Sequence, residues 1–243
     1  MADHNGICTK EQISAVLTRL AEIRRNIATA CEAADRPADS VRLMAVTKTV
    51  DPALINAAVD EGVTLLGENR VQEFLSKRDA YRPQAEVQFI GHLQTNKVKQ
   101  IIDKVTMIQS VDSLHLAEAV SRAAEAKGIV MPVLLEVNIG GELSKSGAAP
   151  DEIPALLKAV QPLAGIRVDG LMTIPPPAAD ETEQNTVFAR MKQLYDRLSQ
   201  EAPMHVLSMG MSGDYEAAVR NGATVVRISS ALFGPRMYPQ TAV

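Results

Sequence analysis

The chain has 243 residues, of which 22% are charged and 46% are hydrophobic, and its formal net charge is −4. This composition is typical of a folded globular protein and excludes an intrinsically disordered one. The acidic balance and the few aromatic residues (no Trp, four Tyr, four Phe) speak against nucleic acid as a partner. Its apolar stretches are far shorter than the roughly 18–20 residues of a membrane-spanning helix, so we expect no membrane association.

The first residues lack the charged and then apolar pattern of a signal peptide, so we expect a cytoplasmic protein. In that compartment the two cysteines, Cys8 and Cys31, are expected to be free thiols. No group of Cys, His, Asp or Glu residues has the spacing of a metal site, and we therefore expect no metal.

The first predicted element is a helix that follows Thr9. Thr9 and Gln12 have the spacing of a capping box. Apolar residues then recur at helical spacing from Ile13 to Ile27, and Pro37 lies at or beyond the end of this helix.

Short apolar runs then alternate with helical patterns along the rest of the chain. We predict strands over 42–47, 63–67, 87–91, 106–111, 133–138, 166–173, 205–209 and 224–229. We predict helices between them over 52–61, 71–78, 95–105, 114–126, 152–160, 181–200 and 215–221.

Strands that alternate with helices form parallel sheets through right-handed crossovers, and eight such units form a closed (β/α)8 barrel. We therefore predict an α/β fold: a single TIM-barrel domain over residues 1–243 with an extra N-terminal helix. An open, doubly wound sheet is the alternative. The G-x-G-x-x-G motif that usually follows the first strand of such a sheet is absent.

Functional residues of TIM barrels lie at the C-terminal ends of the strands, and Lys48 follows the first predicted strand. An amine shielded from water there would have a lowered pKa and could form a Schiff base. The simpler interpretation is a solvated lysine that marks the end of the strand.

Arg227 lies in the last predicted strand, where alternation places it on the same face as Val225 and Ser229. If this face points into the barrel, the guanidinium needs a partner, such as the ring nitrogen of a ligand or an acidic side chain. If it points outward, a carboxylate on a helix would pair with it.

Serines follow the last two predicted strands. Ser212 precedes a helical pattern, and Ser229 and Ser230 begin a short helical turn. Helix N-termini bind phosphate through their N–H groups, and barrels often bind phosphate after strands 7 and 8. The pattern indicates an anion site, although these serines could also serve only as helix caps.

Three further residues lie near the expected site. Glu68 and Glu136 could place carboxylates there. Lys145, in a polar loop after the fifth predicted strand, is either solvated or lies at the mouth of the site.

Several segments, taken together and in order, resemble one family. They are AVTKT at 45–49, GENRVQE at 67–73, FIGHLQTNK at 89–97, SKSG at 144–147, GLM at 170–172, LSMGMS at 207–212, VRI at 226–228 and ALFG at 231–234. On these segments the chain resembles the pyridoxal phosphate homeostasis proteins (the YggS/PROSC family).

This resemblance implies a fold-type III barrel, like the N-terminal domain of alanine racemase, that binds pyridoxal 5′-phosphate (PLP). It implies that Lys48 forms the aldimine with the cofactor, that Arg227 faces the pyridine nitrogen and that Asn69 lines the site. A cation at the ring nitrogen disfavours protonation of that nitrogen and weakens the cofactor as an electron sink.

The resemblance also implies that Ser212 and the turn at Ser229 and Ser230 hold the phosphate. The family usually has Gly-Thr where this chain has Ser229 and Ser230. We also include Met209, at the end of the seventh predicted strand, among the expected cofactor-binding residues.

The expected function is to hold PLP and to buffer or deliver it, with apo-PLP enzymes as recipients, as a monomer without turnover of its own. The alternative is an amino-acid racemase on the same barrel, which needs a second base. Tyr81, Tyr195 and Tyr215 do not lie at strand ends, Tyr238 lies in the tail, and the barrel uses up the length that a second domain would need. A Schiff-base aldolase acting on a sugar phosphate is a third possibility, but typical aldolases place the lysine on a later strand.

Overall fold

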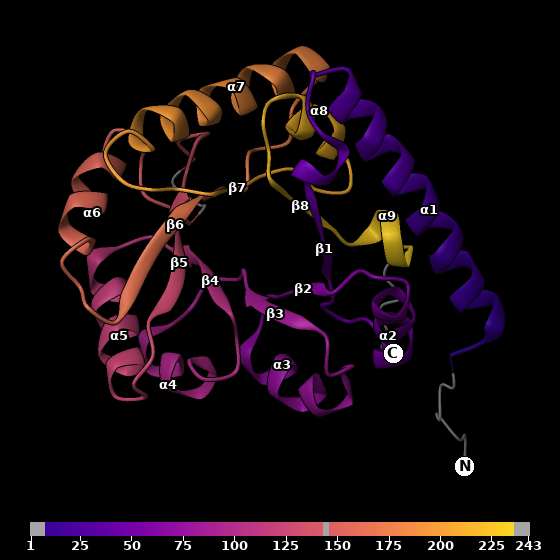
Figure 1. Cartoon of the computed structure of the whole chain (residues 1–243), viewed down its shortest axis with the longest axis horizontal. Helices are drawn as coiled ribbons and strands as arrows, with labels where there is room; N and C mark the ends of the chain where they lie inside the picture. The colour runs from indigo at the N-terminus through magenta and orange to yellow at the C-terminus, as the bar shows by residue number, and fades with distance from the viewer. Residues whose placement is uncertain (1–7, 143–145, 236–243) are drawn as a thin grey trace, which may run out of the picture.

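The computed structural model describes residues 8–142 and 146–235. Eight parallel strands form a closed barrel in chain order, and β8 pairs with β1 (Figure 1). The strands are β1 (Arg42–Val46), β2 (Leu65–Glu68), β3 (Glu86–Phe89), β4 (Met107–Val111), β5 (Met131–Val137), β6 (Ile166–Thr173), β7 (Val206–Ser208) and β8 (Val225–Ile228). The predicted (β/α)8 barrel is confirmed, and every strand begins and ends within about two residues of its predicted bounds.

Helices surround the barrel. They are α1 (Lys10–Glu32), α2 (Pro52–Asp60), α3 (Val71–Lys77), α4 (Val98–Ile101), α5 (Leu114–Glu125), α6 (Ile153–Val160), α7 (Glu181–Leu198), α8 (Tyr215–Arg220) and α9 (Ser230–Phe233). Short 3-10 turns form η1 (Ala38–Ser40), η2 (Arg78–Ala80) and η3 (Thr95–Lys97). Within the described ranges, no helix combines the length and the apolar character needed to cross a bilayer.

One predicted helix is wrong in extent. The pattern over 95–105 forms η3 and the single turn of α4, which ends at Ile101. Ile102 and Val105 are buried like the apolar residues of α4, but they lie in the turn that leads into β4. The apolar spacing in this segment therefore reports burial of a short connection and not a continuous helix.

The predicted N-terminal helix and its capping box are confirmed in α1. The Gln12 N–H donates to Thr9 Oγ1 (3.2 Å), and the Thr9 N–H donates to Gln12 Oε1 (2.8 Å). The helix packs against α2, α8 and α9 through its apolar stripe (Figure 1). It covers the side of the barrel where the four-residue α9 is too short to cover β8 and β1.

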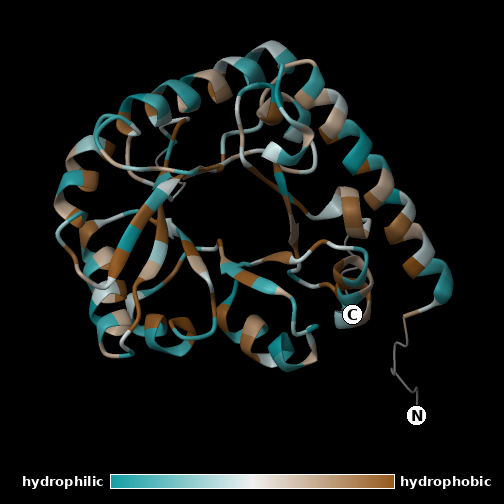
Figure 2. Ribbon diagram, viewed as in Figure 1, coloured by the Kyte–Doolittle hydropathy of each residue, from teal (hydrophilic) through white to brown (hydrophobic). Residues whose placement is uncertain are grey.

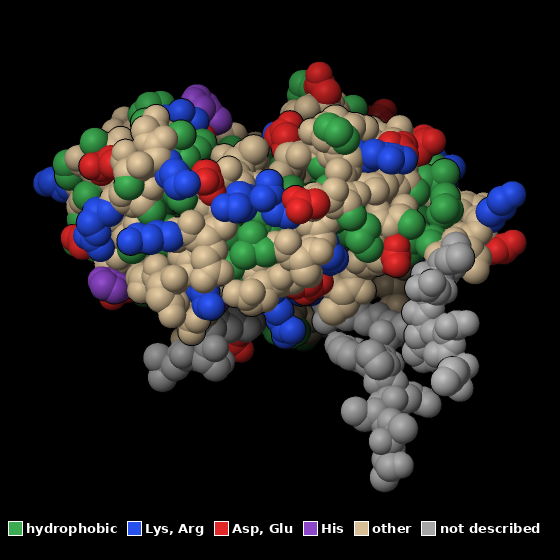
Figure 3. All heavy atoms as spheres, turned by 90° about the horizontal axis from the view of Figure 1, so that it is seen from below, with side chains coloured by type: hydrophobic (Ala, Val, Ile, Leu, Met, Phe, Trp, Pro, Cys, Tyr) green, Lys and Arg blue, Asp and Glu red, His purple; other side chains and the backbone are tan. Residues whose placement is uncertain are grey.

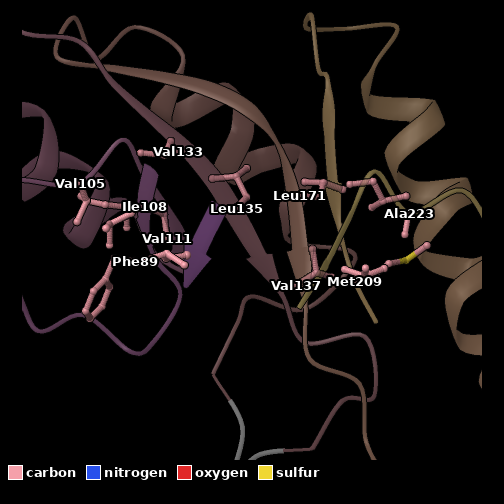
Figure 4. Packing of buried hydrophobic residues seen from close by; sticks show 14 of the residues in the cluster. Phe89, Val105, Ile108, Val111, Val133, Leu135, Val137, Leu171, Met209 and Ala223 are labelled. Carbon is pink, nitrogen blue, oxygen red and sulfur yellow. The ribbon is translucent and has the colours of Figure 1, made fainter. Parts of the chain in front are cut away.

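Most buried apolar side chains lie between the strands and the surrounding helices, in one continuous cluster. Figure 4 shows part of it, with Phe89, Ile108, Leu135 and Leu171 facing outward from four different strands. Hydrophilic residues lie on the outer faces of the helices (Figure 2). Basic and acidic side chains are interspersed on the face shown in Figure 3. Cys8 and Cys31 are free thiols, as expected.

The lumen of the barrel is filled by the alternate side chains of the strands. One part of the lumen is apolar and is formed by two small clusters. The first contains Met44, Val46, Leu65, Ile90 and Val225. The second contains Met107, Leu134 and Met172. The same inward face of the strands carries the buried polar residues Gln88, Gln109, Glu136, Ser208 and Arg227. The lumen therefore holds a cation and a carboxyl group away from water.

Glu136 is the buried carboxyl group of the lumen. Its neighbours Leu135 and Val137 belong to the outer core, so the Glu136 side chain faces inward beside Leu134 on the same strand face. Only 6% of the residue is exposed. Burial and, to a smaller extent, the negative charge of Asp112 raise the pKa of Glu136 to about 7, whereas the positive charge of Arg227 opposes this shift.

We expect Leu20→Ala to lower the free energy of unfolding by about 2–5 kcal/mol, because the Leu20 side chain is 2% exposed and its loss leaves a cavity under α1. Urea unfolding followed by circular dichroism measures the change. The matched control is Arg25→Ala on the exposed face of the same helix, which should shift the free energy by less than about 0.5 kcal/mol. Equal effects of the two substitutions would show that α1 is not packed as described.

We expect Glu136→Gln to flatten the dependence of stability on pH. The folded protein keeps a proton on Glu136 that the unfolded chain releases between its ordinary pKa of 4.5 and about pH 7. Stability must therefore fall as the pH rises through this window, by up to about 3 kcal/mol from this one group. Urea unfolding at several pH values checks this, and identical slopes for wild type and Glu136→Gln would contradict it.

Candidate functional site

A cavity of about 230 Å³ opens at the C-terminal ends of the strands. Its lining comes from the ends of β1, β2, β3, β6, β7 and β8 and consists of Val46, Lys48, Asn69, Ile90, Ile174, Met211, Ser212, Gly213, Arg227, Ser229 and Ser230. A larger hollow of about 410 Å³ lies at the opposite end of β1 and β2, under α1. Ligand sites of TIM barrels form at the C-terminal ends, and there the polar groups converge in this chain.

Lys48 enters the cavity by strand alternation. Met44 and Val46 face the lumen, and Lys48 is the next residue on the same face, just beyond the end of β1. Its side chain is partly buried and lines the cavity together with Arg227 and the serines. The lysine is therefore part of the cavity lining and is partly shielded from water.

Arg227 points into the lumen and lines the cavity, which decides between the two orientations considered above. It is 3% exposed. Nη1 donates to Ser208 Oγ (2.8 Å) and Nη2 donates to the Thr173 carbonyl (2.7 Å). Burial lowers the pKa of Arg227 to about 10, while the charges of Asp214 and Glu136 oppose this shift. The guanidinium is therefore still protonated at neutral pH.

The hydrogen bonds of Arg227 continue across the barrel. Ser208 Oγ accepts from the arginine and donates to Gln109 Oε1 (2.7 Å), and Gln109 Nε2 donates to Gln88 Oε1 (2.6 Å). An arginine can only donate, so it fixes the direction of each later bond in this chain. The row Arg227–Ser208–Gln109–Gln88 holds the guanidinium in one orientation at the bottom of the cavity.

Two backbone N–H groups converge at the ends of β7 and β8. The Ser229 N–H (3.1 Å) and the Ala231 N–H (3.2 Å) both donate to Ser212 Oγ. Ser229 Oγ donates to the Val46 carbonyl (3.1 Å) and so ties the end of β8 to that of β1. Adjacent N–H groups that point at one oxygen are an arrangement that binds anions such as phosphate.

Asp214 lies beside these serines. Burial raises its pKa, although the Met211 N–H donates to Asp214 Oδ1 (2.5 Å) and the charge of Arg227 favours the ionised form. The carboxyl group thereby fixes the backbone that carries Met211 and Ser212 into the cavity.

Asn69 supplies an acceptor without a partner. Its Oδ1 atom is buried and forms no hydrogen bond in the structure, although the residue lines the cavity. Its backbone is held by Gly91, where any Cβ atom would lie 2.1 Å from the Asn69 carbonyl oxygen. Since buried polar atoms almost always have partners, a ligand with a donor group fits here.

Met209 does not line the cavity. Ser208 faces the lumen, so its neighbours Leu207 and Met209 face the helices, and Met209 is fully buried in the outer core (Figure 4). The methionine of the cavity is Met211. Sequence reasoning missed Met211 because Gly210 ends the regular alternation with a φ of +91°.

The remaining candidates lie elsewhere. Glu68 is buried on the outer side of β2. Lys145 and Tyr238 lie outside the described residues. Within the described ranges, no group of three or more His, Cys, Asp or Glu residues could hold a metal ion.

Comparisons with known proteins show relatives along most of the chain. A family model described as "Alanine racemase, N-terminal domain" matches residues 18–237. The chain is 42% identical over 223 residues to a pyridoxal phosphate homeostasis protein of Aquifex aeolicus, which covers 90% of this chain and 98% of that protein. The chain is also 40% identical over 233 residues to a pyridoxal phosphate homeostasis protein of Pseudomonas aeruginosa. This match covers 93% of this chain and 98% of that protein.

Solved structures show the same barrel. PipY of Synechococcus elongatus with PLP bound has a TM-score of 0.77 and 33% identity, over 90% of this chain and 100% of PipY. An alanine racemase of Clostridium difficile has a TM-score of 0.70 but only 16% identity, and 58% of its length is covered, so it supports the fold alone. From the family model and from relatives this similar along nearly their whole length, the chain belongs to the pyridoxal phosphate homeostasis protein family.

Proposed function

We propose that this chain binds pyridoxal 5′-phosphate in the cavity at the C-terminal ends of the strands and acts as a PLP homeostasis protein. The observation that carries the proposal is the convergence of Lys48, Arg227 and the serines Ser212, Ser229 and Ser230 around one cavity of about 230 Å³. These three features suit three polar groups of the cofactor: its aldehyde, its ring nitrogen and its phosphate.

The residues present fit this cofactor. Lys48 would provide the covalent attachment, Ser212, Ser229 and Ser230 would hold the phosphate, and Arg227 would face the ring nitrogen. The buried acceptor Asn69 Oδ1, which has no partner in the structure, is a further sign of a polar ligand. Met209 is not part of this proposal, because it lies in the outer core.

The cofactor supplies an aldehyde carbon that a primary amine attacks, forming a C=N bond and releasing the carbonyl oxygen as water. Lys48 must be directed at this carbon and must lose its protons during the condensation. The closed barrel provides the direction, because the alternation that buries Met44 and Val46 also points Lys48 inward.

Arg227 would tune the electronic character of a bound cofactor. It is buried, protonated at neutral pH and fixed by Ser208 and the Thr173 carbonyl. A guanidinium beside the ring nitrogen disfavours protonation of that nitrogen, and an unprotonated ring is a weaker electron sink. We infer that this cation narrows the reactions that the bound cofactor could support.

The racemase alternative lacks a second base in the described part of the chain. The hydroxyl groups of Tyr81, Tyr195 and Tyr215 are hydrogen-bonded to Glu68, the Met204 carbonyl and Asn26, away from the cavity. Glu136 has a pKa near 7 but does not line the cavity. We therefore propose a carrier that acts as a monomer and either buffers PLP in the cytoplasm or delivers it to apo-PLP enzymes.

We expect the purified protein to become yellow with PLP and borohydride to fix one cofactor per chain at Lys48. Lys48→Ala should abolish the colour and the borohydride-stable adduct, because no other amine of the described residues lines the cavity. Absorbance spectra and peptide mass spectrometry measure both. Lys99→Ala, an exposed lysine far from the cavity, is the control, and a coloured Lys48→Ala variant would contradict the proposal.

We also expect the PLP-loaded protein to racemise L- or D-alanine no faster than free PLP at the same concentration, because the described residues offer no second base at the cavity. Circular dichroism or a chiral separation of the amino acid follows the reaction. Racemisation that exceeds this level and is lost in Lys48→Ala would favour the racemase.

A further inference from the structure

The backbone around Lys48 adopts a conformation that is unusual for its sequence. The Val50 N–H donates to the Thr47 carbonyl (3.1 Å), which closes a turn with Lys48 and Thr49 at its centre. Thr49 has a φ of +61°. Glycine or asparagine usually fills this position of a turn, and a β-branched residue there is strained. Something in the fold must compensate for this strain.

One ion pair on α3 contacts both peptide groups of Lys48. Glu73 Oε1 accepts from the Thr49 N–H (2.5 Å), which belongs to the peptide group after Lys48. Lys77 Nζ donates to the Thr47 carbonyl (2.9 Å), which belongs to the peptide group before Lys48. The two side chains also bind each other, since Lys77 Nζ donates to the same Glu73 oxygen (2.7 Å). The pair therefore spans the turn from one side to the other.

The environment of this pair sets it apart from an ordinary surface pair on a helix. The side chains of Lys77 and Glu73 are only 13% and 20% exposed. Burial alone would raise the pKa of Glu73, but the hydrogen bonds from Lys77 and from the Thr49 N–H bring it below its usual value. Exposed pairs four residues apart on a helix contribute little to stability, whereas this pair is shielded and bound to backbone.

The outer side of the turn is also anchored. Thr47 Oγ1 donates to Glu68 Oε1 (2.7 Å), and the Tyr81 hydroxyl donates to the same oxygen. The Thr47 side chain is thereby held on the outer side of the barrel, so Lys48, the next residue, must point inward. The Glu73–Lys77 pair then decides the course of the backbone after Lys48.

We propose that Glu73 and Lys77 are positioning residues for Lys48, which hold its two peptide groups so that the amine points into the cavity before the cofactor arrives. This inference rests on the proposed function and assigns a role to the GENRVQE segment beyond Asn69. Misplacing a reacting group by about 1 Å can cost about a hundredfold in rate. The pair should therefore affect the attachment step and not the binding of the phosphate or the ring.

The test compares two ligands in Glu73→Ala, Glu73→Gln and Lys77→Met. The first ligand is PLP, and the rate at which the borohydride-reducible adduct forms at Lys48 is followed by stopped-flow absorbance. The second is pyridoxine 5′-phosphate, which carries an alcohol in place of the aldehyde and cannot attach to an amine. Its affinity reports on the cavity alone. Asp196→Asn is the matched control, because it removes an i,i+4 pair with Lys192 on α7, away from the cavity.

We expect attachment to slow by about tenfold to a hundredfold in Glu73→Ala, with an unchanged affinity for pyridoxine 5′-phosphate. Glu73→Gln should fall between this variant and wild type, since an amide oxygen can still accept from the Thr49 N–H. Hydrogen exchange at the Thr49 amide, measured by NMR without ligand, should become faster in Glu73→Ala. The control should change none of these quantities.

Several results would overturn the proposal. An unchanged rate of attachment in Glu73→Ala and Lys77→Met would show that the pair does not position Lys48. Loss of both ligands in parallel would show a general structural role. If Glu73→Ala does not fold, Glu73→Gln and Lys77→Met decide by the same two readouts. A wild-type protein that forms no adduct at all would overturn the proposed function and this inference with it. That result differs from the others, in which the wild type forms the adduct and only the variants change.

Discussion

The site depends on a cation that the barrel buries. A guanidinium inside a protein is tolerated only where hydrogen bonds replace its water, and Arg227 finds them in Ser208 and the Thr173 carbonyl. Because arginine only donates, it imposes the orientation of Ser208, and through it that of Gln109. The lumen is thus organised around a fixed positive charge before any ligand enters, and it suits a ligand that presents an unprotonated nitrogen or an anion.

The closed barrel turns the alternation of strands into the composition of the site. Along β1 and just beyond its end, Met44 is followed on the inward face by Val46 and Lys48. On the neighbouring β8 and just beyond its end, Val225 is followed by Arg227 and Ser229. This relation is readable in the sequence, because alternation has a strict period of two residues. Alternation alone does not tell which face of a strand is the inner one. For Arg227 it allows a side chain that points into the barrel or one that points outward to the helices. Packing of Val226 and Ile228 against the outer core settles the choice.

Other features lay beyond what the sequence could predict. Met209 was assigned to the site from its place at a strand end, although the polar Ser208 beside it occupies the inward position. The contacts of Glu73 and Lys77 with Thr49 and Thr47 join residues 24 and 30 positions apart. No local pattern encodes such contacts, since they arise only when α3 packs beside the end of β1. Local periodicity therefore predicted the strands and most of the helices, and the tertiary contacts decided how the lysine is held.

The proposed function asks the site to hold a cofactor by attachment. Attachment needs one directed amine, and a turn held at both peptide groups of Lys48 supplies it without a conformational change. Racemisation needs in addition a second acid or base at the substrate carbon. Within the described residues the cavity lining offers no side chain for that role, and the proposed absence of turnover rests on this. The proposed role therefore needs only the attachment chemistry of this fold.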